Sequence, residues 1–134
     1  MYEYRCKIFN IVDGDTVDID IDLGFGVWMA HQRIRLYGID TPESRTSDEE
    51  EKKYGIAAKN FLEKWLAQGN IILKTHKDAT GKFGRILGEL WYGDVNINLK
   101  LVENHHAVEY HGQSKEEIAE KHIANREKVK IDES

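Results

Sequence analysis

The sequence has a single cysteine, no excess of basic residues and no long apolar run, and each shortage excludes a class of protein. Cys6 has no second cysteine with which to form an intrachain disulfide, and we expect it to be a buried strand residue. No apolar run is long enough for a transmembrane segment, and no stretch is of low complexity. With 40% hydrophobic and 32% charged residues, the 134 residues predict an ordinary globular chain with one domain over residues 1–134.

The start of the chain lacks the apolar leader of a secreted protein. Residues 4–9 read YRCKIF, without a small-residue cleavage site. We therefore expect a cytoplasmic location if the chain is complete. A trimmed mature domain of a secreted protein would begin in the same way.

What the sequence does contain is a dense group of charges around its one proline. Residues 35–43 read RLYGIDTPE and place an arginine and two carboxylates beside that turn. Upstream, residues 12–17 read VDGDTV and add a carboxylate after an Asp-Gly turn, while residues 82–85 read KFGR and add an arginine. Carboxylates hold divalent cations, and guanidinium groups hold phosphate oxygens. This combination predicts phosphodiester hydrolysis.

In order and spacing, these motifs resemble the staphylococcal nuclease-like (thermonuclease) domains. The match comprises DGDTV at 13–17, R-L-x-G-I-D-T-P-E at 35–43, YG at 54–55 and KFGR at 82–85. Residues 95–102 resemble the family's second helix and residues 114–130 its last helix, so the resemblance covers nearly the whole chain. It implies a mainly β, α+β fold: a five-stranded OB-type barrel with about three attached helices.

The resemblance also implies an activity and a metal. Family members are Ca2+-dependent nucleases that hydrolyse DNA and also RNA, breaking the bond to the 5'-oxygen and leaving 3'-phosphate ends. The implied Ca2+ ligands are Asp15, Asp40 and the backbone carbonyl of Thr41. Each aspartate alone would more simply be a turn residue.

The implied catalytic residues are Glu43 and two arginines. Glu43 would orient or deprotonate the attacking water, and the sequence leaves both roles open. Arg35 and Arg85 would stabilise the charge that builds on the phosphate in the transition state. The plainer interpretation of Glu43 is a surface carboxylate, and that of Arg35 is a structural ion pair with Asp40 or Glu43.

Three further residues are expected to contact the substrate, namely Lys82, Phe83 and Tyr110. Relatives have tyrosine in place of Phe83, so base stacking is kept while a hydroxyl contact is lost. The match at Tyr110 needs a one-residue gap, which leaves nucleotide preference open. We expect DNA and RNA as partners, no membrane, and a monomer.

The net charge of -5 is unusual for a protein that grips a phosphate backbone. Acidic residues gather at 48–51 and near the C-terminus, while several cations lie close to the motifs. A weakly basic cleft on an acidic body suffices for an enzyme that holds one phosphate transiently. The rival hypotheses are a catalytically silent OB-type module that binds nucleic acid or protein, and a calcium-binding domain, which would leave the arginines unexplained.

Hydrophobic periodicity places these motifs on expected elements. Strands are predicted at 4–12, 16–22, 27–36, 71–75 and 85–92, with a loop over 44–53 and a helix over 54–67. A short helix should run to residue 102 from Asn96 or Asn98, and Ser114 with Glu117 forms a capping-box pattern before the last helix. The alternating aspartates at 18–22 predict a solvated strand face, with a second metal site as the alternative.

Overall fold

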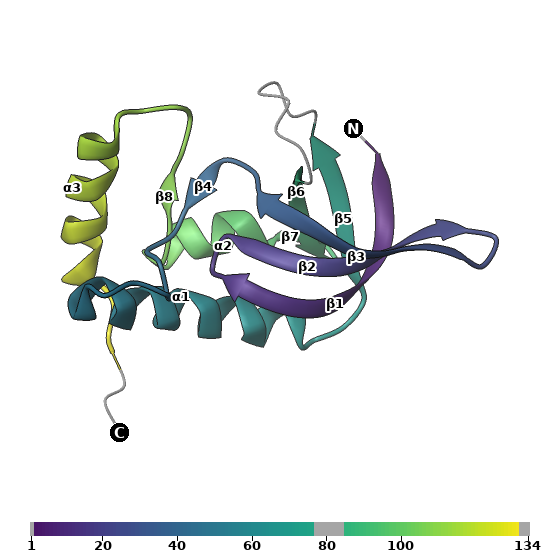
Figure 1. Ribbon diagram of the computed structural model, residues 1–134, viewed down its shortest axis with the longest axis horizontal. Coiled ribbons are helices and arrows are strands. Elements are labelled where there is room, and N and C mark those ends of the chain that lie inside the picture. The colour runs from purple at the N-terminus through teal and green to yellow at the C-terminus, as the bar shows by residue number, and fades with distance from the viewer. Residues whose placement is uncertain (1, 77–84, 132–134) are drawn as a thin grey trace.

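The protein folds into a β-barrel with helices packed against it (Figure 1). The structure is a computed structural model that describes residues 2–76 and 85–131. Within these residues the strands are β1 (Glu3–Asp13), β2 (Thr16–Gly24), β3 (Val27–Leu36), β4 (Ile39–Asp40), β5 (Ile71–His76), β6 (Arg85–Tyr92), β7 (Val95–Asn96) and β8 (Val108–Glu109). The helices there are α1 (Glu49–Leu66), α2 (Ile97–Glu103) and α3 (Lys115–Arg126).

The barrel closes through a parallel pairing between two strands that are distant in sequence. The sheet order is β3-β2-β1-β5-β6-β7, and β3 also pairs with β6, from Arg33 opposite Arg85 to Leu36 opposite Gly88. Five strands therefore form a closed mixed barrel, which confirms the predicted OB-type α+β fold. A second pairing, β4 with β8, joins Asp40 to Val108 at one end of the barrel.

The core follows from strand alternation. Val17, Ile19 and Ile21 point into the barrel from β2, and the aspartates between them remain outside. Those aspartates have protein partners: Asp18 pairs with Arg33, and Asp20 accepts a hydrogen bond from the His31 backbone N–H at 2.8 Å. The contacts agree with the predicted outer strand face.

The predicted loop over 44–53 is wrong in its second half. Helix α1 begins at Glu49, because the Asp48 side chain accepts hydrogen bonds from the backbone N–H groups of Glu50 and Glu51. The negative charges of three glutamates in the first turn then interact favourably with the positive end of the helix dipole and stabilise the helix. The polar composition that suggested a loop is the composition of a helix N-terminus.

The other helix starts agree with their predicted caps. Of the two candidates for α2, Asn96 is the cap, since its side chain accepts a hydrogen bond from the Leu99 backbone N–H. Asn98 is instead buried, and its amide bonds to backbone groups of β6 and to the Tyr37 carbonyl. Ser114 caps α3 by accepting from the Glu117 backbone N–H.

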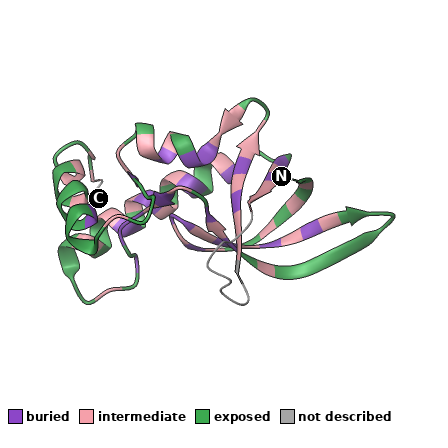
Figure 2. Ribbon diagram, turned by 90° about the horizontal axis from the view of Figure 1, so that it is seen from above, coloured by how far each residue is buried: buried purple, intermediate pink, exposed green. Residues whose placement is uncertain are grey.

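The β2–β3 hairpin extends beyond the barrel and is largely exposed at its tip (Figure 2). Positive φ angles at Phe25 and Gly26 form the turn. Cys6 lies half-buried on β1, and burial raises the pKa of its thiol to about 12. Within residues 2–76 and 85–131, no helix has both the length and the apolar character needed to cross a membrane.

Candidate active site

The alternation of β3 places two arginines on the outside of the barrel. Ile34 and Leu36 are buried, so Arg33 and Arg35 project from the opposite face of the strand. Arg33 forms two hydrogen bonds with Asp18, of 2.9 and 3.2 Å, which lower the pKa of that carboxyl. Its side chain is 51% exposed, as expected of a surface charge.

Asp15 lies in the turn between β1 and β2 and reaches across to the proline motif. Its Oδ2 accepts a hydrogen bond from the Thr41 backbone N–H at 3.0 Å, and its Oδ1 accepts one from the Thr16 hydroxyl at 2.9 Å. The residue is buried. This aspartate therefore connects two of the sequence motifs through its side chain.

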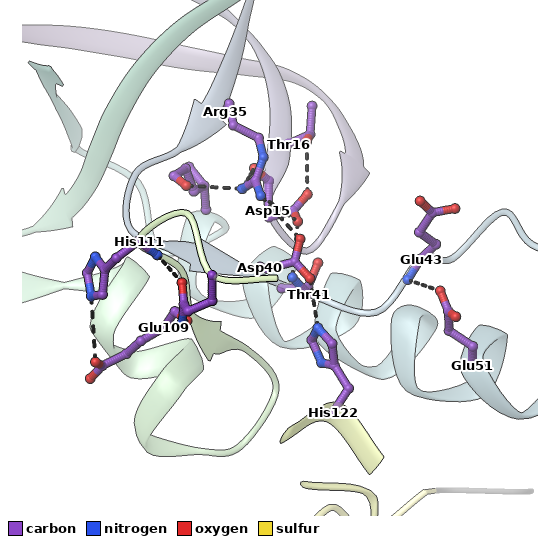
Figure 3. A network of polar contacts seen from close by, with 12 residues as sticks. Asp15, Thr16, Arg35, Asp40, Thr41, Glu43, Glu51, Glu109, His111 and His122 are labelled. Carbon is purple, nitrogen blue, oxygen red and sulfur yellow. Dashed lines mark hydrogen bonds and ion pairs between the residues drawn. The ribbon is translucent and has the colours of Figure 1, made fainter. Parts of the chain in front are cut away.

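Arg35 lies between two carboxylates from different segments (Figure 3). Its Nη2 atom is 3.4 Å from Asp15 Oδ2 and 3.3 Å from Asp40 Oδ1. The guanidinium side chain is only 16% exposed, and its Nη1 donates to the Leu36 carbonyl oxygen at 3.1 Å. The ion pair with Asp40 that the plainer interpretation anticipated is present, and Asp15 shares the same nitrogen.

Glu43 is exposed and stands apart from this cluster, next to Glu51 (Figure 3). Its backbone N–H donates to Glu51 Oε2 at 3.1 Å, so a carboxylate of helix α1 fixes the backbone at this position. The Glu43 carboxylate itself is left facing solvent. An exposed carboxylate at the edge of the site can approach a water molecule without first breaking a protein contact.

The segment that bears Thr41 and Glu43 is held by close packing. Asp13 accepts hydrogen bonds from both the backbone N–H and the hydroxyl of Ser44. Gly55 of α1 lies against the same segment, and a Cβ atom there would lie 2.2 Å from the Glu43 carbonyl oxygen. Only glycine allows the helix to approach so closely.

Most of the expected site residues border one groove. It has a volume of about 590 Å³ and lies between the proline motif, the start of α1 and the face of α3. Its lining includes Arg35, Asp40, Thr41, Glu43 and Tyr110. The Tyr110 backbone N–H donates to the Gly38 carbonyl oxygen at 2.8 Å, which places the β8 end beside the β3–β4 turn.

Three expected residues belong in whole or in part to the segment that is not described. Lys82 and Phe83 lie outside the described residues. Arg85 begins β6 opposite Arg33, one strand away from Arg35, but its side chain lies outside the described part of the structure. Its place beside Arg35 at the groove therefore remains a prediction.

The donor set suits a hard cation with few protein ligands. Within residues 2–76 and 85–131, no group of three or more His, Cys, Asp or Glu side chains is arranged to hold a metal ion. Two carboxylates nevertheless converge on one cationic nitrogen, and Asp15 is buried. Oxygen ligands completed by carbonyls and waters are what Ca2+ accepts.

Comparison with known proteins places this chain in a family. The profile described as staphylococcal nuclease homologue matches residues 33–131. The chain belongs to this family. The chain is similar to the thermonuclease of Staphylococcus intermedius, with 37% identity over 94 residues, which cover 70% of this chain and 52% of the relative. The thermonuclease of Staphylococcus hyicus is 30% identical over 101 residues, 75% of this chain and 56% of the relative.

This staphylococcal nuclease homologue spans about half the length of the curated relatives it matches. A third relative, protein ParB of Escherichia coli, is 33% identical over 97 residues, which cover 72% of this chain and 45% of the relative. The two thermonucleases carry the activity in their names. For this chain, the match establishes the family.

Sequence reasoning missed one residue of the site, His122 of α3. Its Nε2 lies 2.7 Å from Asp40 Oδ2, and its side chain is only 13% exposed. The sequence signal was limited to the helix face: Ser114 sets the helix start, and the buried Ile118 lies four residues before His122 on the same face of α3. His106 instead packs against the Phe61 ring, and burial lowers its pKa.

Proposed function

We propose that this protein is a Ca2+-dependent nuclease that hydrolyses phosphodiester bonds in DNA and RNA and leaves 3'-phosphate ends. One observation carries the proposal: Asp15 and Asp40 approach the same Arg35 nitrogen, at 3.4 and 3.3 Å, and Arg35, Asp40 and Glu43 border one groove. A purely structural ion pair would need one carboxylate. Two carboxylates on one arginine form a site whose charges can be shared with a cation and a phosphate.

In this proposal the two aspartates and the Thr41 carbonyl would hold Ca2+. Bound there, the ion would supply positive charge to the scissile phosphate. It would thereby reduce the electrostatic repulsion between the negatively charged transition state and the nearby carboxylates. Asp15 is prepared for this role because the Thr41 N–H and the Thr16 hydroxyl already fix both of its oxygens. The Asp15 oxygens are thus held in place before substrate binds.

Arg35 would bind the phosphate oxygens in the same proposal. Its guanidinium is oriented by the Leu36 carbonyl and by two carboxylates, and a rigid fork loses little entropy on binding phosphate. Its attraction grows as charge develops on the phosphoryl oxygens, and only such differential binding speeds the reaction. Arg85 would act on the same phosphate or on the leaving 5'-oxygen.

Glu43 would position the attacking water or accept its proton. The Glu43 backbone N–H donates to Glu51 Oε2, and this hydrogen bond fixes the position of the Glu43 backbone. The exposed Glu43 carboxylate is free to accept a hydrogen bond from water. The competing hypothesis is a silent binding module. Such a module has no need for two aspartates on one arginine and a solvent-facing glutamate on the groove that this arginine lines.

The test is degradation of single-stranded DNA and of RNA, with Ca2+ and with excess chelator. We expect activity to require Ca2+ in the millimolar range, the weak end for sites with few protein ligands. Asp40→Ala should abolish it, whereas Asp18→Ala, which removes an outer-face aspartate of β2, should not. Undiminished cleavage in chelator, or products lacking a 3'-phosphate, would overturn the proposal as stated.

A further inference from the structure

The Asp40 carboxylate is held on both of its oxygens, by side chains from opposite sides. Arg35 of β3 contacts Oδ1 at 3.3 Å, and His122 of α3 contacts Oδ2 at 2.7 Å (Figure 3). Because an ionised carboxylate only accepts hydrogen bonds, the imidazole must donate from Nε2. The contact therefore requires a proton on His122 Nε2 and fixes the orientation of the aspartate.

The β4–β8 pairing and helix α3 together bring His122 next to Asp40. Asp40 lies on a strand of two residues, β4, which pairs with β8 at Val108. The Ser114 cap then starts α3, and the buried Ile118 anchors the helix one turn before His122. A strand this short cannot fix a side chain by itself, so contacts from outside the strand determine where the carboxylate points.

We propose that His122 is a positioning residue that holds Asp40 ready to bind Ca2+, a role that rests on the proposed function. With Arg35 as its only partner, the Asp40 carboxylate could rotate about the Cβ–Cγ bond. Binding of the ion would then cost the entropy of that rotation. Hydrogen bonds to metal-ligating carboxylates commonly change metal affinity about 10-fold or more. His122 thus makes the C-terminal helix part of the metal site.

The alternative role for His122 is purely mechanical, a contact that attaches α3 to the barrel. The two roles predict different measurements. A mechanical contact would change the melting temperature and leave the Ca2+ dissociation constant unaltered in the folded protein. A positioning contact changes that constant, and a side chain that restores the hydrogen bond restores the affinity.

The experiment measures Ca2+ binding by calorimetry in four variants of the full chain. His122→Leu removes the donor, His122→Gln keeps one near the Nε2 position, and His122→Asn has an amide too short to reach it. Lys121→Leu, at the exposed neighbouring position of α3, is the matched control. Circular dichroism and melting temperature establish that each variant is folded.

We expect His122→Leu to weaken Ca2+ binding about 10-fold, His122→Gln to recover most of the loss, and Lys121→Leu to bind like wild type. Should the leucine variant fail to fold, tighter binding by the glutamine than by the asparagine variant supports the role, and equal binding refutes it.

Two results would overturn the inference in distinguishable ways. If wild type binds Ca2+ and folded His122→Leu binds it equally, the positioning role fails while the proposed nuclease stands. If wild type itself shows no saturable Ca2+ binding and Asp40→Ala changes nothing, the metal site fails and the role of His122 fails with it.

Discussion

At the scale of single residues, two arginines on one face of β3 differ in their surroundings. Arg33 and Arg35 are two positions apart, and each pairs with an aspartate of the β1–β2 region. Arg33 is 51% exposed with one partner, whereas Arg35 is 16% exposed with two. Arg35 therefore contacts two negative charges with its single positive charge, whereas Arg33 and Asp18 neutralise each other.

Arg35→Lys should lower nuclease turnover by about 100-fold at saturating Ca2+, the scale of losing one preorganised donor to a developing oxyanion. A lysine keeps the charge but offers a single point in place of a two-oxygen fork. Arg33→Lys is the matched control on the same strand and should keep wild-type turnover. Bidentate recognition would have to be abandoned if both lysine variants turned over alike.

At the scale of elements, helix α1 determines the path of the proline motif. Gly55 touches the Glu43 backbone, and Gly14 of the β1–β2 turn lies against Thr41 and Ala58, where a Cβ atom would be 2.8 Å from the Ala58 Cβ. Two glycines from different elements thus enclose the segment that bears the proposed ligand and base. Gly55 of the YG motif is therefore explained by packing against the Glu43 backbone, in addition to the resemblance to the family.

Gly55→Ala should destabilise the fold and reduce activity, although alanine favours a free helix by about 1 kcal/mol over glycine. The opposite sign is expected because the added methyl group would meet the Glu43 carbonyl at 2.2 Å. Asn60→Ala, at an exposed position of α1, is the control for helix propensity. Urea unfolding measures the effect, and a more stable Gly55→Ala would contradict this packing.

The sequence predicted the elements whose signals are local. Alternation located the barrel strands, and short polar motifs located the caps of α2 and α3. The start of α1 was missed because Asp48 and three glutamates resemble a loop when the helix dipole is ignored. The β4–β8 pairing was missed because two-residue strands carry no periodicity.

The site was predictable to the same extent. Arg35, Asp40, Thr41 and Glu43 are consecutive enough to be found as a motif, and the structure places them on one groove. His122 is remote in sequence from Asp40, and only tertiary packing of α3 brings it there. Motif matching finds residues that act together along the chain, and it omits those delivered by a separate helix.

At the scale of the whole molecule, charge is the main departure from an ordinary nucleic-acid-binding surface. The chain carries a net charge of -5. Among the described residues that line the groove, cations and carboxylates are mixed: Arg35, Lys115 and Arg126 lie with Asp40, Glu43, Asp48 and Glu51. General electrostatic attraction to the proposed nucleic-acid substrate should therefore contribute little, and its capture should depend on Ca2+ at the site.

The salt dependence of binding tests this distribution of charge. Counterion release makes the slope of log affinity against log salt proportional to the number of phosphates neutralised, about 0.7 per phosphate for single strands. If contacts are limited to Arg35, Arg85, Lys82 and one further lysine, the slope should correspond to about three or four phosphates. The measurement uses a short DNA single strand and the Glu43→Gln variant, with Ca2+ present, so that binding is not obscured by cleavage. A slope of about eight phosphates or more would show an extended basic track, and the acidic body would then not limit binding.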